Sequence, residues 1–342
     1  MSVSTLKKAE SQDYEQTANS PLTHRVRASR PQKQKILVPV LIQIVTFFGL
    51  ATLLYPSAAD WFATLNHNAE ISGYIQNVEQ LEVAGQQENL LVAQEYNSNI
   101  PPGMLRDPYS TNAAAEAAVS GSSYDEYLKT MLVGESSVIG EISYPRLKVD
   151  LPIYHGTTDE VISKGAGHLY GSSLPIGGAS THTLLTAHSG LAKAPLFTPV
   201  LEAQIGDVFH VTSLGETRYY EVEAVQTILP EETAGLGIVD GADLATLITC
   251  TPLGSNTHRL LVQGVRIPPP DTKKSADEIV IAGDGKQAGF PWWALGFIGG
   301  NAVVATTLFA KPKRQRPRLK KTDNRMSRHE NGISRGKSER SL

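Results

Sequence analysis

The residue best suited to covalent chemistry is the only cysteine of the chain, Cys250. It ends an apolar, strand-like run at 244–249 and precedes a loop that contains Pro252, Gly254 and Asn256. A rigid strand can hold a nucleophilic thiolate in place while the following loop admits a substrate. The alternative is a buried cysteine that packs as a small hydrophobic residue. Because the chain has one cysteine, an intrachain disulfide, a Cys-rich zinc site and a CxxC redox pair are excluded.

Two side chains elsewhere in the sequence could act on this thiol. His188 stands where a strand-like run at 184–187 passes into a glycine turn, and an imidazole there could accept the proton of the thiol. Arg259 begins the apolar segment after the Cys250 loop, so a hairpin would return its guanidinium to the sulfur. There it could stabilise the oxyanion of a tetrahedral intermediate. The alternative for Arg259 is an ordinary surface position on a strand.

The histidines do not predict a metal site. His168, His182 and His188 are separated by 14 and 6 residues, spacings that match no standard zinc site. His182 and His210 lie inside strand-like runs, where we expect packed or surface side chains. We therefore expect neither a metal nor another cofactor.

Two uncharged segments are long enough to span a membrane. Residues 36–55 and 290–310 contain 20 and 21 residues without Asp, Glu, Lys or Arg. About 20 helical residues cross the ~30 Å hydrocarbon core of a bilayer. The second segment is less apolar, but Trp292 and Trp293 stand where an interfacial aromatic belt would. A buried core helix is the alternative for either segment, and a cleavable signal peptide is the alternative for the first, although its apolar run exceeds the usual length.

Charge is segregated along the chain. Residues 1–35 carry seven Lys and Arg against three Asp and Glu, residues 311–342 carry twelve against three, and residues 36–310 carry 12 against 28. Since basic residues stay on the cytoplasmic side of a membrane, both termini are expected inside the cell and residues 56–289 outside. The basic tails are therefore explained as signals that set this topology and as contacts with anionic lipids. The net charge of −3 argues against nucleic-acid binding.

The chain between the two apolar segments divides into a helical part and a β-rich part. Apolar residues recur at spacings of three and four from 61 to about 97, with Gly73 and Gly85 as expected breaks between helices. From 138 onwards, β-branched and aromatic runs alternate with Gly, Pro and Asp turns roughly every ten residues, which is typical of a sandwich or barrel. The clearest runs are 181–185, 208–212, 219–227, 244–250 and 259–267.

Residues 246–252 (TLITCTP) and 256–262 (NTHRLLV) resemble the signature of sortases, the cysteine transpeptidases of Gram-positive cell surfaces. The resemblance covers about 138–267, including GAGH at 165–168 and GSSLP at 171–175.

This resemblance implies a closed β-barrel in which Cys250 attacks the substrate, His188 transfers protons and Arg259 assists. Two positions depart from the family pattern. Ala187 replaces the usual Gly before the histidine, and Leu253 replaces a common Tyr. Neither change removes a reacting group.

The surroundings of this core resemble class C, the pilin-polymerising sortases. A C-terminal membrane segment in addition to an N-terminal one is a feature of that class, and Asp107-Pro108-Tyr109 matches its Asp-Pro-aromatic lid. The resemblance implies that Asp107 pairs with Arg259 and that Tyr109 covers Cys250. The alternative is an ordinary Asp-Pro turn in a linker.

The resulting prediction is a mainly β protein, a sortase-type closed barrel preceded by helices and a lid and flanked by two transmembrane helices. The predicted boundaries are 1–35 (basic tail), 36–55 (span), 56–103 (helices), 104–134 (lid), 135–268 (barrel), 269–289 (linker), 290–310 (span) and 311–342 (basic tail). The implied partners are proteins with an LPxTG-like sorting signal (pilins), cleaved between Thr and Gly through a thioacyl intermediate, and an acceptor amine, for class C a pilin lysine. A housekeeping sortase that acts on peptidoglycan and a non-catalytic membrane scaffold are the alternatives.

Overall fold

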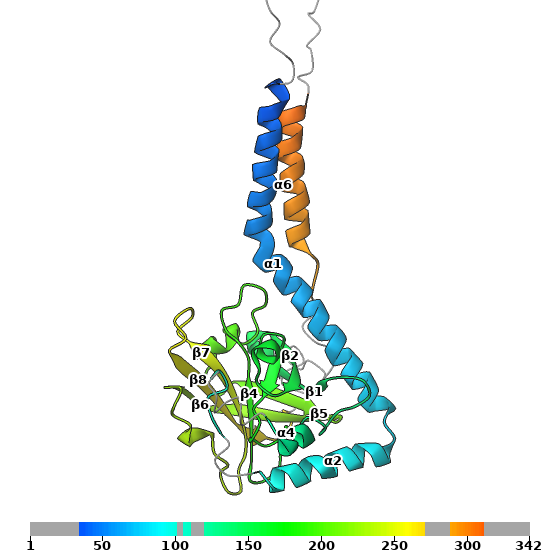
Figure 1. The fold of residues 1–342 in the computed structure, drawn as a ribbon, viewed down its shortest axis with the longest axis vertical. Helices are drawn as coiled ribbons and strands as arrows, with labels where there is room; N and C mark the ends of the chain where they lie inside the picture. The colour runs from blue at the N-terminus through cyan, green and yellow to red at the C-terminus, as the bar shows by residue number, and fades with distance from the viewer. Residues whose placement is uncertain (1–33, 101–104, 111–119, 271–287, 311–342) are drawn as a thin grey trace, which may run out of the picture.

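A computed structural model describes residues 34–100, 105–110, 120–270 and 288–310 of the chain. Within these residues, two long helices lie side by side and lead away from a β-barrel (Figure 1). Apart from positions 34 and 35, the predicted basic tails lie outside the described residues. So do residues 104 and 111–119 of the predicted lid and residues 271–287 of the predicted linker.

The barrel is built from the β-rich part of the sequence. Its strands are β1 (Val138–Tyr144), β2 (Val149–His155), β3 (Ala166–His168), β4 (Thr181–Thr186), β5 (Val208–Ser213), β6 (Glu216–Ile228), β7 (Asp243–Thr251) and β8 (His258–Ile267). They close in the order β1-β2-β3-β4-β7-β8-β6-β5. The pairs β2–β3 and β4–β7 are parallel. The predicted closed barrel is confirmed.

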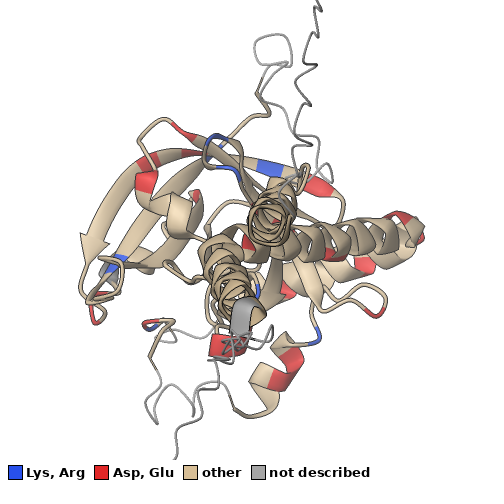
Figure 2. Cartoon of the chain, turned by 90° about the horizontal axis from the view of Figure 1, so that it is seen from above, with Lys and Arg blue, Asp and Glu red and all other residues tan. Residues whose placement is uncertain are grey.

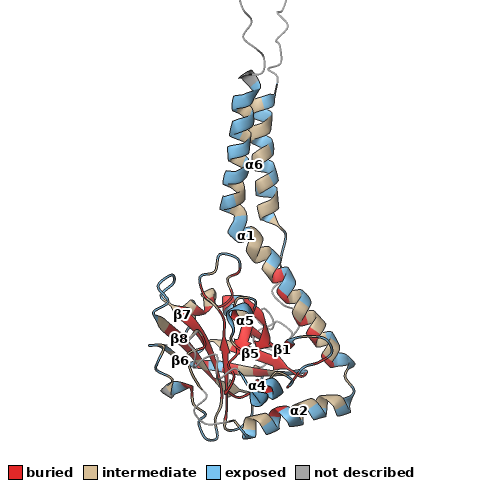
Figure 3. Cartoon of the chain, viewed as in Figure 1, coloured by how far each residue is buried: buried red, intermediate tan, exposed pale blue. Residues whose placement is uncertain are grey.

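Strands β4 and β7 are buried on both faces, which explains their nearly continuous apolar sequences. Successive side chains of a strand point to opposite faces. Leu185 and Leu247 therefore join the main core, while Leu184 and Ile248 belong to a second, smaller cluster. Leu169, Leu236 and Leu261 complete that cluster. In Figure 3 the buried residues are concentrated in the strands of the barrel.

The first helix is longer than the sequence indicates. α1 (Gln34–Gln80) runs unbroken from the apolar segment to the barrel, and α2 (Val83–Ser98) follows. The break expected at Gly73 is wrong, because packing against the barrel holds the helix together there. The neighbouring Tyr74 is buried, donates a hydrogen bond to the carbonyl of Ile139 (3.0 Å) and accepts one from the Leu214 amide (2.9 Å). The chain breaks instead between the two helices, just before Gly85.

α1 and α6 (Trp292–Phe309) are both long and apolar enough to cross a membrane, and neither apolar stretch is buried in the protein. The amide of Gln43 donates to Asn301 Oδ1 at 2.9 Å, and such polar pairs help helices associate in a bilayer. Gly300 lets the helices approach closely, since a Cβ there would lie 2.9 Å from Leu50 Cδ1. The paired parts of both helices carry no charged residues, whereas acidic residues are spread over the rest of the molecule (Figure 2).

We expect cysteines placed at Leu50 and Gly300, in a Cys250→Ala background, to form a disulfide because these positions face each other across the helix pair. After mild oxidation of membranes, the full chain should migrate faster on a non-reducing gel. A control pair at Val45 and Val303, which are both exposed, should stay unlinked. Equal cross-linking of the two pairs would mean that the helices do not keep this arrangement.

Candidate active site

Three neighbouring strands bring Cys250, His188 and Arg259 together. In the parallel pair β4–β7, Thr186 lies opposite Ile248. His188 and Cys250 each lie two residues further on, so the two residues lie at the same end of these strands. In the antiparallel pair β7–β8, Cys250 lies directly opposite Arg259. The barrel order β4-β7-β8 thus gathers the three predicted catalytic residues at one place.

The guanidinium of Arg259 is held by the predicted lid. Its Nε and Nη2 donate to the two carboxylate oxygens of Asp107 at 2.7 and 2.8 Å, a two-pronged ion pair. Its Nη1 donates to the carbonyls of Asn256 (2.9 Å) and His258 (3.0 Å). Burial lowers the pKa of Arg259, but the hydrogen bonds to Asp107 and the nearby acidic groups outweigh this and raise the pKa above its ordinary value. While the lid is in place, Arg259 is charged and engaged with its own chain.

Tyr109 lies across the ends of β4 and β7. Its hydroxyl accepts a hydrogen bond from Thr186 Oγ1 (2.8 Å) and donates to the carbonyl of Ala187 (2.7 Å). The ring centres of Tyr109 and His188 are 5.7 Å apart, and the Arg259 guanidinium lies 4.8 Å from the Tyr109 ring centre. Burial raises the pKa of Tyr109, so the phenol stays neutral and can donate. Leu105 and Tyr109 also pack against the second apolar cluster, which secures this part of the lid.

The side chain of Cys250 is buried beneath these residues, and 5% of the residue is exposed. Burial raises the pKa of the thiol, the charge of Arg259 lowers it, Asp107 raises it, and a hydrogen bond with Tyr109 lowers it. The net effect is a raised pKa. This arrangement therefore favours the neutral thiol of Cys250. Asp107 contributes because it offsets the positive charge that would stabilise the thiolate.

His188 lies just beyond β4, and contacts outside the strand hold it. Its amide donates to the carbonyl of Ile162 (3.1 Å), and its carbonyl accepts from the Phe197 amide (3.1 Å). Its Nε2 lies 2.9 Å from an oxygen of Asp159. Sequence reasoning missed Asp159, which precedes His188 by 29 residues. A contact over that distance leaves no local pattern in the sequence.

A family model described as the sortase domain matches residues 142–267. The structure is similar to the crystal structure of sortase C-1 from Actinomyces oris, with 43% sequence identity and a TM-score of 0.50 over 54% of this chain and 99% of that chain. It is also similar to the pilus-related sortase C of Group B Streptococcus, with 40% identity and a TM-score of 0.51 over 57% of this chain and 95% of that chain. This chain belongs to the sortase family. Sortases are cysteine transpeptidases, and the solved structures above are sortases of class C.

Curated sortases match the chain over a shorter stretch. Sortase A of Streptococcus agalactiae is 27% identical over 154 residues, which cover 44% of this chain and 61% of that protein. Sortase A of Bacillus anthracis is 26% identical over 132 residues, which cover 38% of this chain and 60% of that protein. The chain thus spans about 60% of the length of the curated relatives that it matches. Its similarity to the sortase C structures is both higher and more complete.

The two departures from the sortase pattern are accommodated locally. Ala187 is buried, and its backbone does not adopt a positive φ, so glycine is not required there. Its carbonyl accepts hydrogen bonds from Tyr109 and Thr249 (2.7 and 2.9 Å). Leu253 is exposed beside the loop that follows β4, and a Cβ added at Gly190 would lie 3.2 Å from its Cδ2. Leu253 therefore borders the site without closing it.

Other histidines of this sortase have structural partners. His182 lies 2.7 Å from Thr246 Oγ1 and 2.9 Å from the carbonyl of Gly237. His168 is bonded to the hydroxyl of Tyr127 (2.9 Å), and burial lowers its pKa to about 4, which keeps it neutral. Among the residues that the structure describes, no three His, Cys, Asp or Glu side chains gather as a metal site would require.

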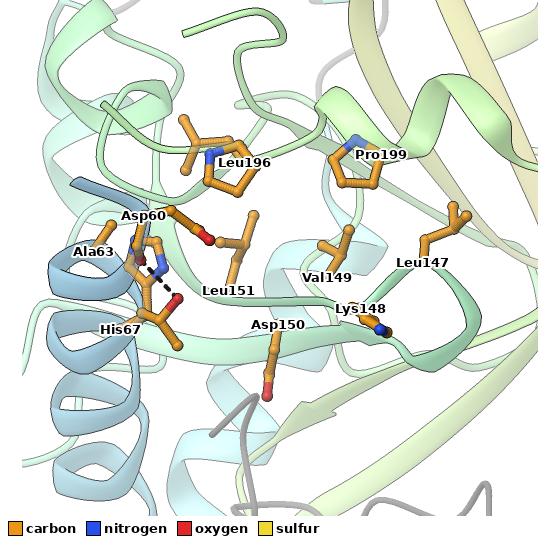
Figure 4. Close-up of a pocket in the computed structure, with 12 residues that line it drawn as sticks. Asp60, Ala63, His67, Leu147, Lys148, Val149, Asp150, Leu151, Leu196 and Pro199 are labelled. Atoms are coloured by element: carbon orange, nitrogen blue, oxygen red, sulfur yellow. Dashed lines mark hydrogen bonds between the residues drawn. The ribbon is translucent and has the colours of Figure 1, made fainter. Parts of the chain in front are cut away.

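A pocket of about 250 Å³ lies between α1 and the barrel and contains none of the predicted site residues (Figure 4). Asp60 and His67 of α1 line one side, and Asp150 of β2 lines another. Leu196 and Pro199 come from the segment between β4 and β5. In the same segment, the amide of Phe197 donates a hydrogen bond to the carbonyl of His188. This segment therefore both lines the pocket and holds the main chain of His188.

Replacing both Asp107 and Tyr109 with Ala should speed alkylation of Cys250 by a small thiol reagent by about 10- to 100-fold. The double change removes the buried ring of Tyr109 and the ion pair between Asp107 and Arg259. Opening exposes the sulfur and removes the carboxylate that offsets Arg259, so the raised pKa of Cys250 should fall. Its thiolate fraction at a given pH should then rise, and the half-maximal rate should move to lower pH. The measurement is the alkylation rate as a function of pH.

Asp125→Ala is the matched control for this experiment. It removes one carboxylate from an exposed position in α4 (Ser122–Tyr127), within the same predicted lid segment. It should leave the alkylation profile unchanged. An unchanged profile in the double variant would reduce the Asp-Pro-Tyr triplet to an ordinary turn.

Proposed function

We propose that this sortase is a membrane-anchored transpeptidase that cleaves an LPxTG-like sorting signal between Thr and Gly and joins the threonine to a pilin lysine. The observation that carries the proposal is the placement of Cys250 opposite Arg259 on the adjacent strands β7 and β8, with His188 just beyond the end of the neighbouring β4 and Asp107 bonded to Arg259. Similarity to sortase C structures, one of them described as pilus-related, supports the choice of substrate.

In the first half of the reaction, Cys250 Sγ attacks the threonine carbonyl and its proton passes to His188. Arg259, released from Asp107, donates hydrogen bonds to the oxyanion of the tetrahedral intermediate. As the Thr–Gly bond breaks, His188 returns the proton to the departing glycine amine. The products are a thioester on Cys250 and the free C-terminal part of the signal.

In the second half, a neutral lysine amine attacks the thioester carbonyl. The tetrahedral intermediate is again stabilised by Arg259 and collapses with loss of the Cys250 thiolate. The proton released by the amine passes to His188 and returns to the sulfur. An amide bond between threonine and lysine is formed, and the enzyme regains its starting state.

The lid supports pilin polymerisation over attachment to peptidoglycan. Asp107-Pro108-Tyr109 resembles the Asp-Pro-aromatic lid of class C, and the matches to sortase A are weaker and shorter. A non-catalytic scaffold would not need a buried thiol opposite an arginine, with a histidine at the end of the neighbouring strand. These features favour an enzyme.

The proposed topology places residues 36–55 and 290–310 in the cell membrane and the barrel outside the cell, with both termini in the cytoplasm. The charge-free pairing of α1 with α6 supports two spans. The Lys and Arg clusters at 1–35 and 311–342 support the orientation.

Cys250→Ala should abolish the covalent, reductant-resistant ladders that form when the full chain in membranes is mixed with a pilin substrate, since no second thiol exists. His188→Ala should lower the rate by about 10²–10⁴ through lost proton transfer. Arg259→Ala should lower it by about 10²–10³ through lost oxyanion stabilisation. Rates are followed by gel densitometry.

His258→Ala and Arg266→Ala are the controls, because both residues lie on β8, are partly exposed and are outside the lid contacts. His258 is next to Arg259, and Arg266 lies near the other end of the strand. Both should retain most of the activity. Ladders formed by Cys250→Ala would end the nucleophile assignment. Transfer to peptidoglycan amines, with no reaction at lysine, would favour the housekeeping alternative.

Topology can be tested with single cysteines in a Cys250→Ala background. Cysteines at Ser20 and Ser334 should resist an impermeant maleimide on intact cells, whereas one at the exposed Ile205 should react. The physical reason is the retention of the basic flanks in the cytoplasm. After permeabilisation all three should react. Labelling of Ser334→Cys from outside would show that the second segment does not span.

A further inference from the structure

The ring of His188 needs a support that survives opening of the lid. His188 lies outside β4, so the strand does not orient its side chain. Tyr109 packs near the ring, but it belongs to the lid and leaves with it. Asp159, whose carboxylate lies 2.9 Å from Nε2, belongs to the barrel and stays.

Asp159 sits on an element that also holds the main chain of His188. It is the first residue of α5 (Asp159–Ile162), a single turn capped by the side chain of Thr158. The last residue of that turn, Ile162, is buried and accepts the hydrogen bond of the His188 amide at 3.1 Å. One short helix therefore fixes both the backbone and the ring of the histidine.

We propose that Asp159 is a positioning residue for His188. This proposal rests on the proposed transpeptidase function. The carboxylate accepts a hydrogen bond from Nε2, so the neutral ring carries its proton on Nε2 and its lone pair on Nδ1. Nδ1 is then the nitrogen that takes the proton of Cys250. When the ring becomes an imidazolium, both nitrogens carry protons and the contact with Asp159 is kept.

The effect is moderate because the pair is open to solvent. The side chain of Asp159 is 86% exposed and that of His188 is 21% exposed. Exposed ion pairs shift equilibria by up to about fivefold. Asp159→Ala should therefore lower kcat for cleavage of a sorting peptide by about three- to fivefold. It should leave KM within about twofold, because Asp159 is assigned no contact with the substrate.

Glu160→Ala is the matched control. Glu160 follows Asp159 in the same turn, is also exposed and carries the same charge. The contact with His188, however, is made by Asp159. Removing it changes the local field by a similar amount but should leave kcat unchanged. Asp159→Glu should restore kcat, and Asp159→Asn, which keeps an acceptor oxygen, should restore part of it.

The decisive experiment combines these rates with ¹⁵N NMR of the full chain, labelled at histidine and assigned with His188→Ala. The wild type should show His188 protonated on Nε2, and Asp159→Ala should show a mixture of tautomers. An Nδ1-protonated ring in the wild type would overturn the proposal, as would equal kcat losses in Asp159→Ala and Glu160→Ala. If the wild type cleaves no sorting peptide, the proposed function fails, and the tautomer measurement still decides the role of Asp159.

Discussion

The site depends on the register between β4, β7 and β8. A slip of one residue between β7 and β8 would turn Cys250 to the opposite face and remove it from Arg259. Burial of β7 on both faces prevents the slip, because Leu247 and Ile248 of this strand pack into different clusters and both would be displaced. Closure of the barrel adds a constraint, since every strand has two partners. The proposed nucleophile Cys250 and the proposed oxyanion donor Arg259 are therefore carried by strands whose register is fixed.

In the proposed mechanism, the carboxylate of Asp107 and the oxyanion of the substrate compete for the guanidinium of Arg259. Removing one partner of a buried ion pair commonly costs about 3–5 kcal/mol, because a charge is left unpaired. Asp107 satisfies Arg259 in the closed state, and in the proposed reaction the oxyanion takes its place. When the lid opens, water or the arriving substrate must compensate for the lost ion pair of Arg259. The same carboxylate also helps to keep the Cys250 thiol protonated, so one contact withholds both the oxyanion donor and the thiolate.

Features with a short range in the sequence were predictable, and features with a long range were not. Runs of β-branched residues between turns indicate the barrel strands, and the eight residues between Cys250 and Arg259 suit a hairpin. The pairing of Asp107 with Arg259 spans 152 positions, and only the family resemblance indicated it. Asp159 lies in a four-residue turn without a motif. The break expected at Gly73 failed because propensity yields to packing, here that of Tyr74.

The proposed membrane anchor also constrains the barrel. α1 continues beyond the predicted span, and Tyr74, which lies 19 residues after Tyr55, fastens it to the barrel. At about 1.5 Å per residue this places the attachment about 30 Å along the helix from the end of the span. Pro56 lies inside α1 and removes a backbone hydrogen bond, which accounts for a bend in the helix (Figure 1). A flexible linker would let the barrel adopt any orientation. A packed helix limits both the height and the direction from which Cys250 meets a membrane-bound substrate.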